Sequence, residues 1–328
     1  MLSLFFLKKE QSGKEKQLNN TSEMKKTSIG GSALIEGVMM KGPHKLGMGL
    51  RKPDGTIEEV VWELPQKEKP WYMTTPIIRG VFNFVDSMKF SYKCPSYSAE
   101  VAGFEDEEPS KFEIKLKELL GDKFASFLNG IALVLGVLLA VAIFFVIPTT
   151  IVGFLRRFIE WQAALTLIEA VVKIGIFVVY VAVISRMEEI KRVFEYHGAE
   201  HKTISCYEAG EELTVENVRR HSRFHPRCGT SFIIITLIVS VLVSSLISWS
   251  NVLIRIALKV ITLPIVMGVA YEAIKFAGRS ESCVAGWLSK PGIWMQHLTT
   301  REPDDGQIEC AIAAMKPCIP ENSEDDRW

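Results

Sequence analysis

Two histidines and one glutamate within a single short segment have the spacing of a metal site. His197 and His201 are four residues apart, and Glu200 directly precedes the second histidine. On a helix, residues four apart lie on the same face, so the two imidazoles can bind one ion. Glu200 lies between them in angle, where it can accept a proton from water at the ion, as in inverted zinc-protease motifs, or bind the ion itself. We therefore predict a divalent metal site, with zinc as the expected ion.

A second group of candidate ligands lies just before the third long apolar segment. Four of the six histidines fall between His197 and His225, and Cys228 follows three residues after His225. Pro226 predicts a turn that holds both side chains at the membrane surface. His197, His201 and His225 would then be three ligands, with Cys228 as a candidate fourth. Three protein ligands with one open position are typical of catalytic zinc, whereas a closed set of four is typical of structural zinc.

Other side chains near these clusters complete the candidate site. Lys202 and Arg227 are cations that could stabilise a developing oxyanion or a phosphate group. His221 lies four residues before His225, but Pro226 ends a helix there, so His221 is a weaker ligand candidate. Without a metal, the same histidines could bind lipid phosphate beside Lys202 and Arg227, and Cys228 would be a small buried residue.

The composition indicates a membrane protein. Apolar residues make up 48% of the 328-residue chain, and the 38 Lys and Arg residues equal the 38 Asp and Glu residues, which excludes nucleic-acid binding through bulk positive charge. A helix needs about 20 apolar residues to cross a bilayer. Four segments meet this length: residues 125–154, 163–184, 231–248 and 252–270. We predict a mainly α fold, a four-span transmembrane bundle with the lipid bilayer as its partner.

The distribution of basic residues predicts the orientation of the bundle. The loop between the second and third segments carries Arg186, Lys191, Arg192, Lys202, Arg219, Arg220, Arg223 and Arg227. The opposite side has Arg156 and Arg157 in its connections, and we expect Arg255 and Lys259 to reach that outer surface. Because basic residues favour the cytoplasmic side, both termini and the central loop are predicted to be cytoplasmic. Free cysteines fit that reducing compartment.

Glu169 and Lys173 are charged residues inside the second apolar segment, four positions apart with the acid first. Ionised groups at such depth are costly and often functional. This order also suits an ion pair within one helix. The sequence therefore leaves two roles open, a structural pair or part of a polar pathway through the membrane.

The remaining segments divide the chain into a predicted series of units. Residues 33–64 read as short strands and turns, and an apolar pattern after Pro76 predicts an amphipathic helix at the membrane interface. The predicted units are a disordered leader at 1–28, a β-rich element with an amphipathic helix at 29–104, a charged linker at 105–123, a first transmembrane hairpin at 124–184, a cytoplasmic loop with the metal site at 185–229, a second hairpin at 230–277 and a cytoplasmic C-terminal segment at 278–328.

Four motifs in the same order resemble those of the YqhQ-like bacterial membrane proteins. They are residues 35–43 (IEGVMMKGP), 195–202 (EYHGAEHK), 225–232 (HPRCGTSF) and 298–305 (LTTREPDD). The resemblance covers residues 29–315 and implies a protein of the bacterial inner membrane. This family is described as predicted metal-dependent enzymes. His197, Glu200, His201, His225 and Cys228 match its motif positions.

Together these patterns favour a zinc-type hydrolase that acts at the cytoplasmic face on an unknown peptide or lipid-linked substrate. His197, His201 and His225 would hold the ion, Glu200 would be the general base, and Cys228 could be a fourth ligand. The alternative is a non-enzymatic membrane protein, either a transporter that uses Glu169 and Lys173 or a scaffold with a structural metal.

Overall fold

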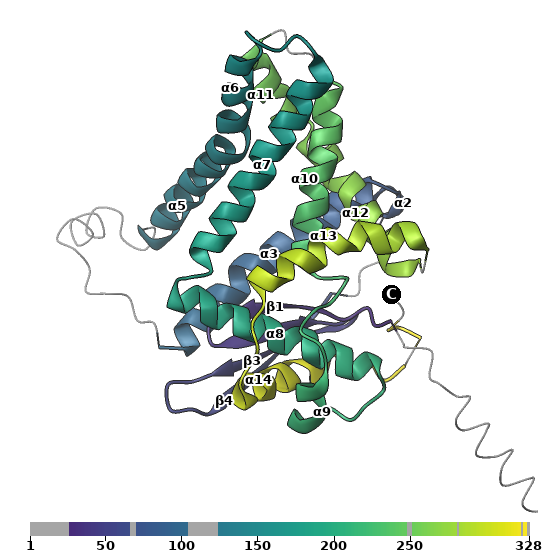
Figure 1. The fold of residues 1–328 in the computed structure, drawn as a ribbon. Helices are drawn as coiled ribbons and strands as arrows, with labels where there is room; N and C mark the ends of the chain where they lie inside the picture. The colour runs from purple at the N-terminus through teal and green to yellow at the C-terminus, as the bar shows by residue number, and fades with distance from the viewer. Residues whose placement is uncertain are drawn as a thin grey trace, which may run out of the picture.

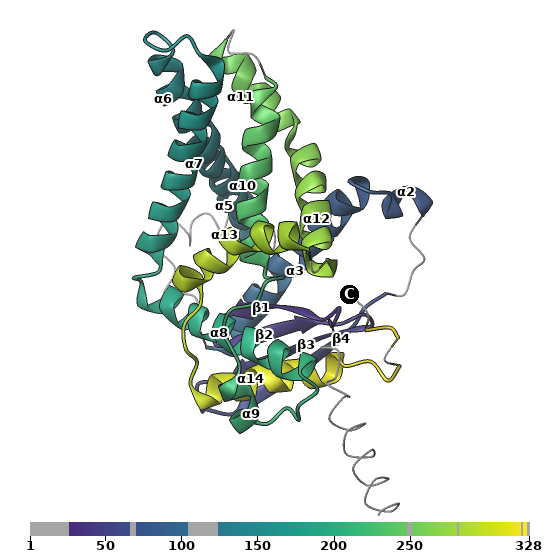
Figure 2. The ribbon, with the colours of Figure 1, turned by 45° about the vertical axis from the view of Figure 1, so that its right-hand side comes forward.

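The computed structural model describes residues 26–65, 70–103, 124–247, 251–280, 282–322 and 324–326. A column of apolar helices stands on a unit made of one sheet and several helices, as the two views show (Figure 1, Figure 2). The predicted charged linker and nearly all of the predicted leader lie outside the described residues. Thr27 belongs to the predicted disordered leader, but its side chain is buried and donates a hydrogen bond to Asp326 Oδ1.

The small N-terminal sheet is an antiparallel meander, as predicted. Its strands pair in the order β1-β2-β3-β4. They are β1 (Gly30–Leu34), β2 (Gly37–Lys41), β3 (Lys45–Arg51) and β4 (Ile57–Glu63). Glycines in β3 permit a close approach of helix α14, because a Cβ at Gly47 would meet the carbonyl of Ala314 and one at Gly49 would meet that of Cys310.

Helices cover both faces of this sheet. One face packs on α8 and α14 through a core that includes Val38, Tyr196 and Ile308. The other face packs on α3, where Cys94 contacts the cluster around Met48. The helices of this unit are α2 (Trp71–Thr74), α3 (Ile78–Val101), α8 (Glu188–Glu208), α9 (Val215–Arg220), α14 (Asp305–Met315) and the short η3 (Lys316–Cys318).

These contacts group the chain differently from the predicted series of units. The segment 185–229 is not an open loop, because most of it forms α8 and α9. The β-rich element is not separate either, since it shares one core with α8 and α14. The reason is burial, because a four-stranded sheet has two apolar faces that one helix cannot cover. We call this assembly of sheet, α3, α8, α9 and α14 the α/β unit.

The apolar helices form the column above the α/β unit. They are α5 (Phe124–Val141), η2 (Ala142–Val146), α6 (Ile147–Leu155), α7 (Gln162–Ile184), α10 (Gly229–Ser245), α11 (Val252–Ile261) and α12 (Leu263–Arg279). Helix α13 (Cys283–Thr299) crosses between the column and the α/β unit (Figure 1, Figure 2). The π-helical turn η2 directly precedes α6, which has Pro148 in its first turn, and this fits a proline that cannot donate a backbone hydrogen bond.

By length and composition, fewer than four of the described helices qualify as membrane spans. Within the described residues, Gly130–Leu155 and Gln162–Ile184 are long and apolar enough to cross a membrane. Helices α11 and α12 make a third span only if they count together, because they bend by 50° where Pro264 begins α12. Helix α10 has 17 residues, about 26 Å at 1.5 Å per residue, which is short for a hydrocarbon core of about 30 Å. The chain is therefore a mainly helical membrane protein with two or three candidate spans.

The four charged residues of α7 and α11 are buried, which corrects the prediction that Arg255 and Lys259 reach an outer surface. Glu169 pairs with Arg255 and Lys259, whereas Lys173 donates to the Ser240 hydroxyl. Arg255 and Lys259 do not reach an outer surface, because both side chains are buried. Their position on α11 places them opposite α7, so an acid on the neighbouring helix takes the place of water.

Candidate metal centre

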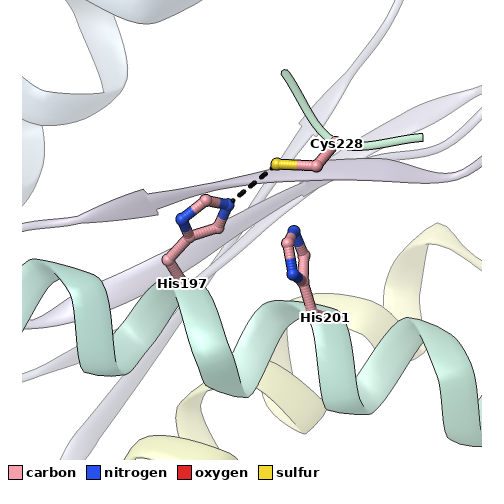
Figure 3. A group of neighbouring side chains, drawn as sticks. All are labelled: His197, His201 and Cys228. Atoms are coloured by element: carbon pink, nitrogen blue, oxygen red, sulfur yellow. Dashed lines mark hydrogen bonds between the residues drawn. The ribbon is translucent and has the colours of Figure 1, made fainter. Parts of the chain in front are cut away.

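Helix α8 places two imidazoles side by side. The His197 and His201 rings lie on one face with their centroids 4.4 Å apart (Figure 3). Gly198 lies between the two histidines in the sequence. A Cβ at this position would meet the carbonyl of Arg301, so the glycine allows α8 to pack against that backbone. The glycine therefore fixes how closely the two histidines approach the segment that follows α13.

Cys228 brings a thiol to the same point from a different helix. It is the N-cap residue of α10, and its Sγ lies 3.1 Å from His197 Nε2. One ligand atom from each of His197, His201 and Cys228 lies within 4.8 Å of the other two. Figure 3 shows both rings directed toward the sulfur. Three side chains of the types that bind transition metals therefore converge, two from α8 and one from the N-cap of α10.

Backbone carbonyls set the orientation of both imidazoles. His197 Nδ1 lies 2.8 Å from the carbonyl oxygen of Thr299, and His201 Nδ1 lies 2.6 Å from that of Arg223. A carbonyl only accepts hydrogen bonds, so each Nδ1 carries the proton and donates it. Each Nε2 then presents its lone pair when the ring is neutral, which is the arrangement of metal-binding histidines. His201 Nε2 is buried and has no hydrogen-bond partner among the described residues.

Glu200 is buried between α8 and strand β1. Its carboxylate lies against Gly31, where a Cβ would meet the side chain at 2.8 Å. Its Oε2 is buried and makes no hydrogen bond within the described part of the chain. Burial raises the pKa of this carboxyl, although the nearby imidazoles of His197 and His201 oppose the rise. A cation beside it would favour the ionised form.

Cys228 and His197 shift each other's pKa. Burial raises the pKa of Cys228, but the adjacent His197 and His201 outweigh it and hold the pKa well below its usual value. Burial lowers the pKa of His197, yet the thiolate outweighs this and raises it to about 9. The backbone N–H of Thr230 also donates to Sγ at the start of α10. This pocket therefore stabilises a thiolate, the form of cysteine that binds metals.

His225 does not join this group, although the sequence predicts it as a ligand. Its ring centroid is 5.7 Å from that of His201, and its Nε2 is 3.5 Å from Glu208 Oε2. Its backbone is held in both directions by the amide of Gln296, which accepts from His225 N and donates to His225 O. Gln296 thus fixes the backbone of His225, whose imidazole lies beside Glu208, and Cys228 is the third member of the group instead.

Lys202 and Arg227 hold the backbone around the centre. Lys202 Nζ donates to the carbonyls of Arg219 and His221, and it pairs with Glu302 at 2.9 Å. Arg227 pairs with Glu208 and donates to the carbonyl of Thr27. These contacts give both cations a structural task, and their predicted catalytic roles stay predictions.

The weaker candidate His221 belongs to a second group. Ligand atoms of His221, Cys206 and Glu211 lie within 4.8 Å of one another. Burial raises the pKa of the Cys206 thiol to about 11, and this thiol donates to the carbonyl of Glu212. A thiol that keeps its proton binds metals poorly, so the group around His197 is the better centre.

Several functional residues escape sequence reasoning. The carbonyls of Thr299 and Arg223 belong to the backbone and carry no residue-type signal. Gln296 is 71 residues from the histidine that it brackets. Gly198 did offer a signal, because a glycine inside a helix costs about 1 kcal/mol relative to alanine and so calls for a packing reason.

Fold and site together define a class of protein: a helical membrane protein whose α/β unit carries a buried histidine and cysteine cluster. Within this class the chain belongs to the family described as protein of unknown function (DUF1385), which matches residues 75–321. The chain is 34% identical over 297 residues to uncharacterized protein YqhQ of Bacillus subtilis (strain 168), and the match covers 89% of this chain and 92% of that relative. This confirms the YqhQ-like resemblance. No solved structure matches the chain.

Proposed function

We propose that this protein is a zinc-dependent hydrolase of the bacterial inner membrane. His197, His201 and Cys228 would hold the ion, and Glu200 would be the general base. The observation that carries the proposal is the convergence of two imidazole Nε2 atoms and one cysteine sulfur, with both Nδ1 atoms bonded to carbonyls. Three nitrogen and sulfur ligands with a fourth position left open are the donor set of catalytic zinc.

The chemistry of this donor set is hydrolysis. Zinc in such a site acts as a Lewis acid and makes water a better nucleophile. The water oxygen would form a bond to the carbonyl carbon or phosphorus of the substrate while Glu200 takes the proton. Glu200 would then pass that proton to the leaving group as its bond breaks. The buried Oε2 of Glu200, one residue from a ligand, supports this assignment.

The setting at the base of the apolar helices favours a substrate at the membrane surface. We propose four membrane passes, with α10 and the bent pair α11 and α12 as the second pair. In this topology the α/β unit and both termini are cytoplasmic, on the side of the Arg- and Lys-rich segment 185–229. A peptide or lipid-linked substrate would then reach the centre from the inner leaflet.

Metal content and hydrolysis test this function together. The detergent-purified protein is expected to hold one zinc ion per chain, His201→Ala to hold none, and His221→Ala to match the wild type. Fluorescent casein and a p-nitrophenyl ester serve as probes, and Glu200→Gln is expected to keep zinc but lose hydrolysis. A wild type that stays metal-free after incubation with zinc would refute the metal site. Zinc bound with full hydrolysis in Glu200→Gln would refute the general base, whereas a zinc-bound wild type that hydrolyses neither probe would favour a structural metal.

A further inference from the structure

The middle of the apolar column contains four buried charged residues. Glu169, Lys173, Arg255 and Lys259 are each at most 3% exposed. Lys173 is the central residue of α7, with eleven residues on either side, so it lies about 16 Å from each helix end at 1.5 Å per residue. If α7 spans the bilayer, Lys173 is at its midplane, where a charged group is costly and marks a functional site.

The positive charges in this column outnumber the negative ones. Across the described helices α5 to α7, α10 and α11, Glu169 is the one acidic residue, whereas Lys173, Arg255 and Lys259 are basic. Two of these bases share the one carboxylate, because Glu169 Oε1 pairs with Lys259 and Oε2 lies 3.3 Å from Arg255. The cluster therefore has an excess of two positive charges in a region of low dielectric constant.

Polar groups of the neighbouring helices offset part of this excess. Arg255 donates to the carbonyls of Ser244 and Ile247, at the end of α10 where the helix dipole is negative. Lys259 donates to the Thr149 hydroxyl at 2.8 Å. These contacts satisfy hydrogen bonds, but a hydroxyl or carbonyl carries no full negative charge. One monovalent anion would halve the excess, to a single positive charge.

Lys173 is the member of the cluster that lacks a carboxylate partner. Its Nζ donates to Ser240 Oγ at 3.0 Å and lies 5.1 Å from the centre of the Phe145 ring. No ion pair within 4.0 Å joins it to an acid in the described part of the chain. Among the described residues, the hydrogen-bond acceptor of this ammonium is a hydroxyl, and Glu169 lies beyond ion-pair distance, so Lys173 has capacity to bind an anion.

An independent feature marks the same place. Phe145 belongs to η2, a π-helical turn inside the first span. Such turns are rare and occur frequently at functional sites, because they interrupt the regular hydrogen bonding of a helix. The Phe144 ring of this turn contacts Phe177 and Tyr180 of α7, so η2 lies directly against the helix that carries Lys173.

We propose that this cluster is a membrane-embedded binding site for a small anion, such as chloride or acetate. Lys173 would contact the anion, Ser240 would add a hydroxyl donor, and Arg255 and Lys259 would supply the field that attracts it. The depth of Lys173 favours a small free anion over the phosphate of a lipid headgroup, since headgroups lie at the bilayer surface. The site is independent of the proposed hydrolase, because none of its residues belongs to the metal centre.

Anion-dependent thermal stability tests this site in the purified full-length protein. Sodium chloride or sodium acetate replaces sodium gluconate at constant ionic strength, from about 1 to 100 mM, and Tm is measured. A ligand that binds only the folded state raises Tm as its concentration rises. We expect a rise of several degrees in the wild type, no rise in Lys173→Met and a preserved rise in Lys173→Arg. Lys290→Met is the matched control, because this exposed lysine lies on α13, and it should behave as the wild type.

Removal of one buried cation should not prevent folding, since a buried charge without an acid partner is itself costly. Cooperative unfolding of Lys173→Met in sodium gluconate would show that this variant folds. If it does not fold, Lys173→Gln replaces it in the same measurement. Equal Tm values of the wild type in chloride, acetate and gluconate would overturn the proposal. The same anion-dependent rise in Lys173→Met would overturn it as well, because the anion would then bind elsewhere.

Discussion

The two buried polar clusters of this molecule have opposite electrostatic requirements. The cluster where the α/β unit meets α10 presents two imidazoles and a thiolate, from His197, His201 and Cys228. The cluster in the apolar column presents ammonium and guanidinium groups, with Glu169 as their shared acid. The first is suited to a cation and the second to an anion. The difference shows that burial alone does not decide which ion a buried polar cluster can bind. The sign of its uncompensated charge decides this.

The two clusters also differ in how they are held. Backbone carbonyls of Thr299 and Arg223 orient the imidazoles, so that a side-chain substitution elsewhere leaves their direction intact. Ion pairs hold Glu169, Arg255 and Lys259 in the column, whereas Lys173 donates to a hydroxyl. Loss of Glu169 should therefore cost more stability than loss of an imidazole or thiol at the other cluster.

The largest expected effect is that of Glu169→Gln. The amide leaves Arg255 and Lys259 buried without their acid, and loss of one partner of a buried pair costs about 3–5 kcal/mol. Glu160→Gln is the matched control, because this acid is exposed just outside α7 and should change stability by less than about 0.5 kcal/mol. Unfolding in detergent measures both. Equal stability of the two variants would show that the ion pairs contribute nothing.

The second effect is on metal affinity, and it separates Cys228 from His225. His197→Ala and Cys228→Ala remove a ligand, so zinc affinity should fall more than about 100-fold, which exceeds the loss of a group that only supports a ligand. His225→Ala should reduce zinc affinity less, because the Nε2 of this imidazole lies beside Glu208 Oε2 and not with the other three side chains. Competition with a chromogenic chelator measures the affinities. A loss in His225→Ala as large as in Cys228→Ala would restore the ligand set predicted from sequence.

The third effect concerns the position of Glu200. Gly31→Ala adds a Cβ at 2.8 Å from the Glu200 side chain, and overpacking of this kind costs about 1–3 kcal/mol. Gly30→Ala is the matched control, since nothing lies within 4 Å of the added atom. Thermal unfolding of both variants is the measurement. If Gly31→Ala is as stable as Gly30→Ala, then Glu200 does not lie against β1.

The smallest effect is a pH dependence of stability. Burial raises the pKa of Glu208, but the hydrogen bond with His225 and the charge of Arg227 outweigh it and lower the pKa below its usual value of 4.5. A lowered folded-state pKa stabilises the protein above pH 4.5, and this contribution is lost as the pH falls below that value. Glu208→Gln should flatten the decline of Tm between neutral and acidic pH. An unchanged acid decline in this variant would contradict the prediction.

Sequence patterns with short periods predicted much of the fold and part of the site. Short extended segments and turn signals predicted the β-rich element, and long apolar runs predicted α7 and the helix at 130–155. The four-residue spacing of His197 and His201 predicted two of the three converging side chains, and Cys228 was predicted as a candidate fourth ligand. In each case the determining contacts lie within one element or between neighbouring elements of the sequence.

The remainder depended on contacts between distant parts of the chain. Gln296 on α13 fixes the backbone of His225, whose imidazole lies beside Glu208, and no local pattern reveals this. Lys259 was expected at an outer surface because a lysine near a helix end can extend to water, but packing of α11 near α7 placed Glu169 beside it instead. The packing of the sheet with α8 and α14 joins residues nearly 300 positions apart, and spacing rules do not extend to such distances.

Helix α10 connects the two clusters along one unbroken axis. It begins after Cys228, carries Ser240 beside Lys173, and presents the carbonyl of Ser244 to Arg255. From Cys228 to Ser240 the helix rises about 18 Å. A displacement of its first turn therefore moves the hydroxyl in the column as well. If a metal ion beside Cys228 changed the affinity for an anion beside Ser240, then by thermodynamic linkage the anion would change the affinity for the metal ion by the same factor.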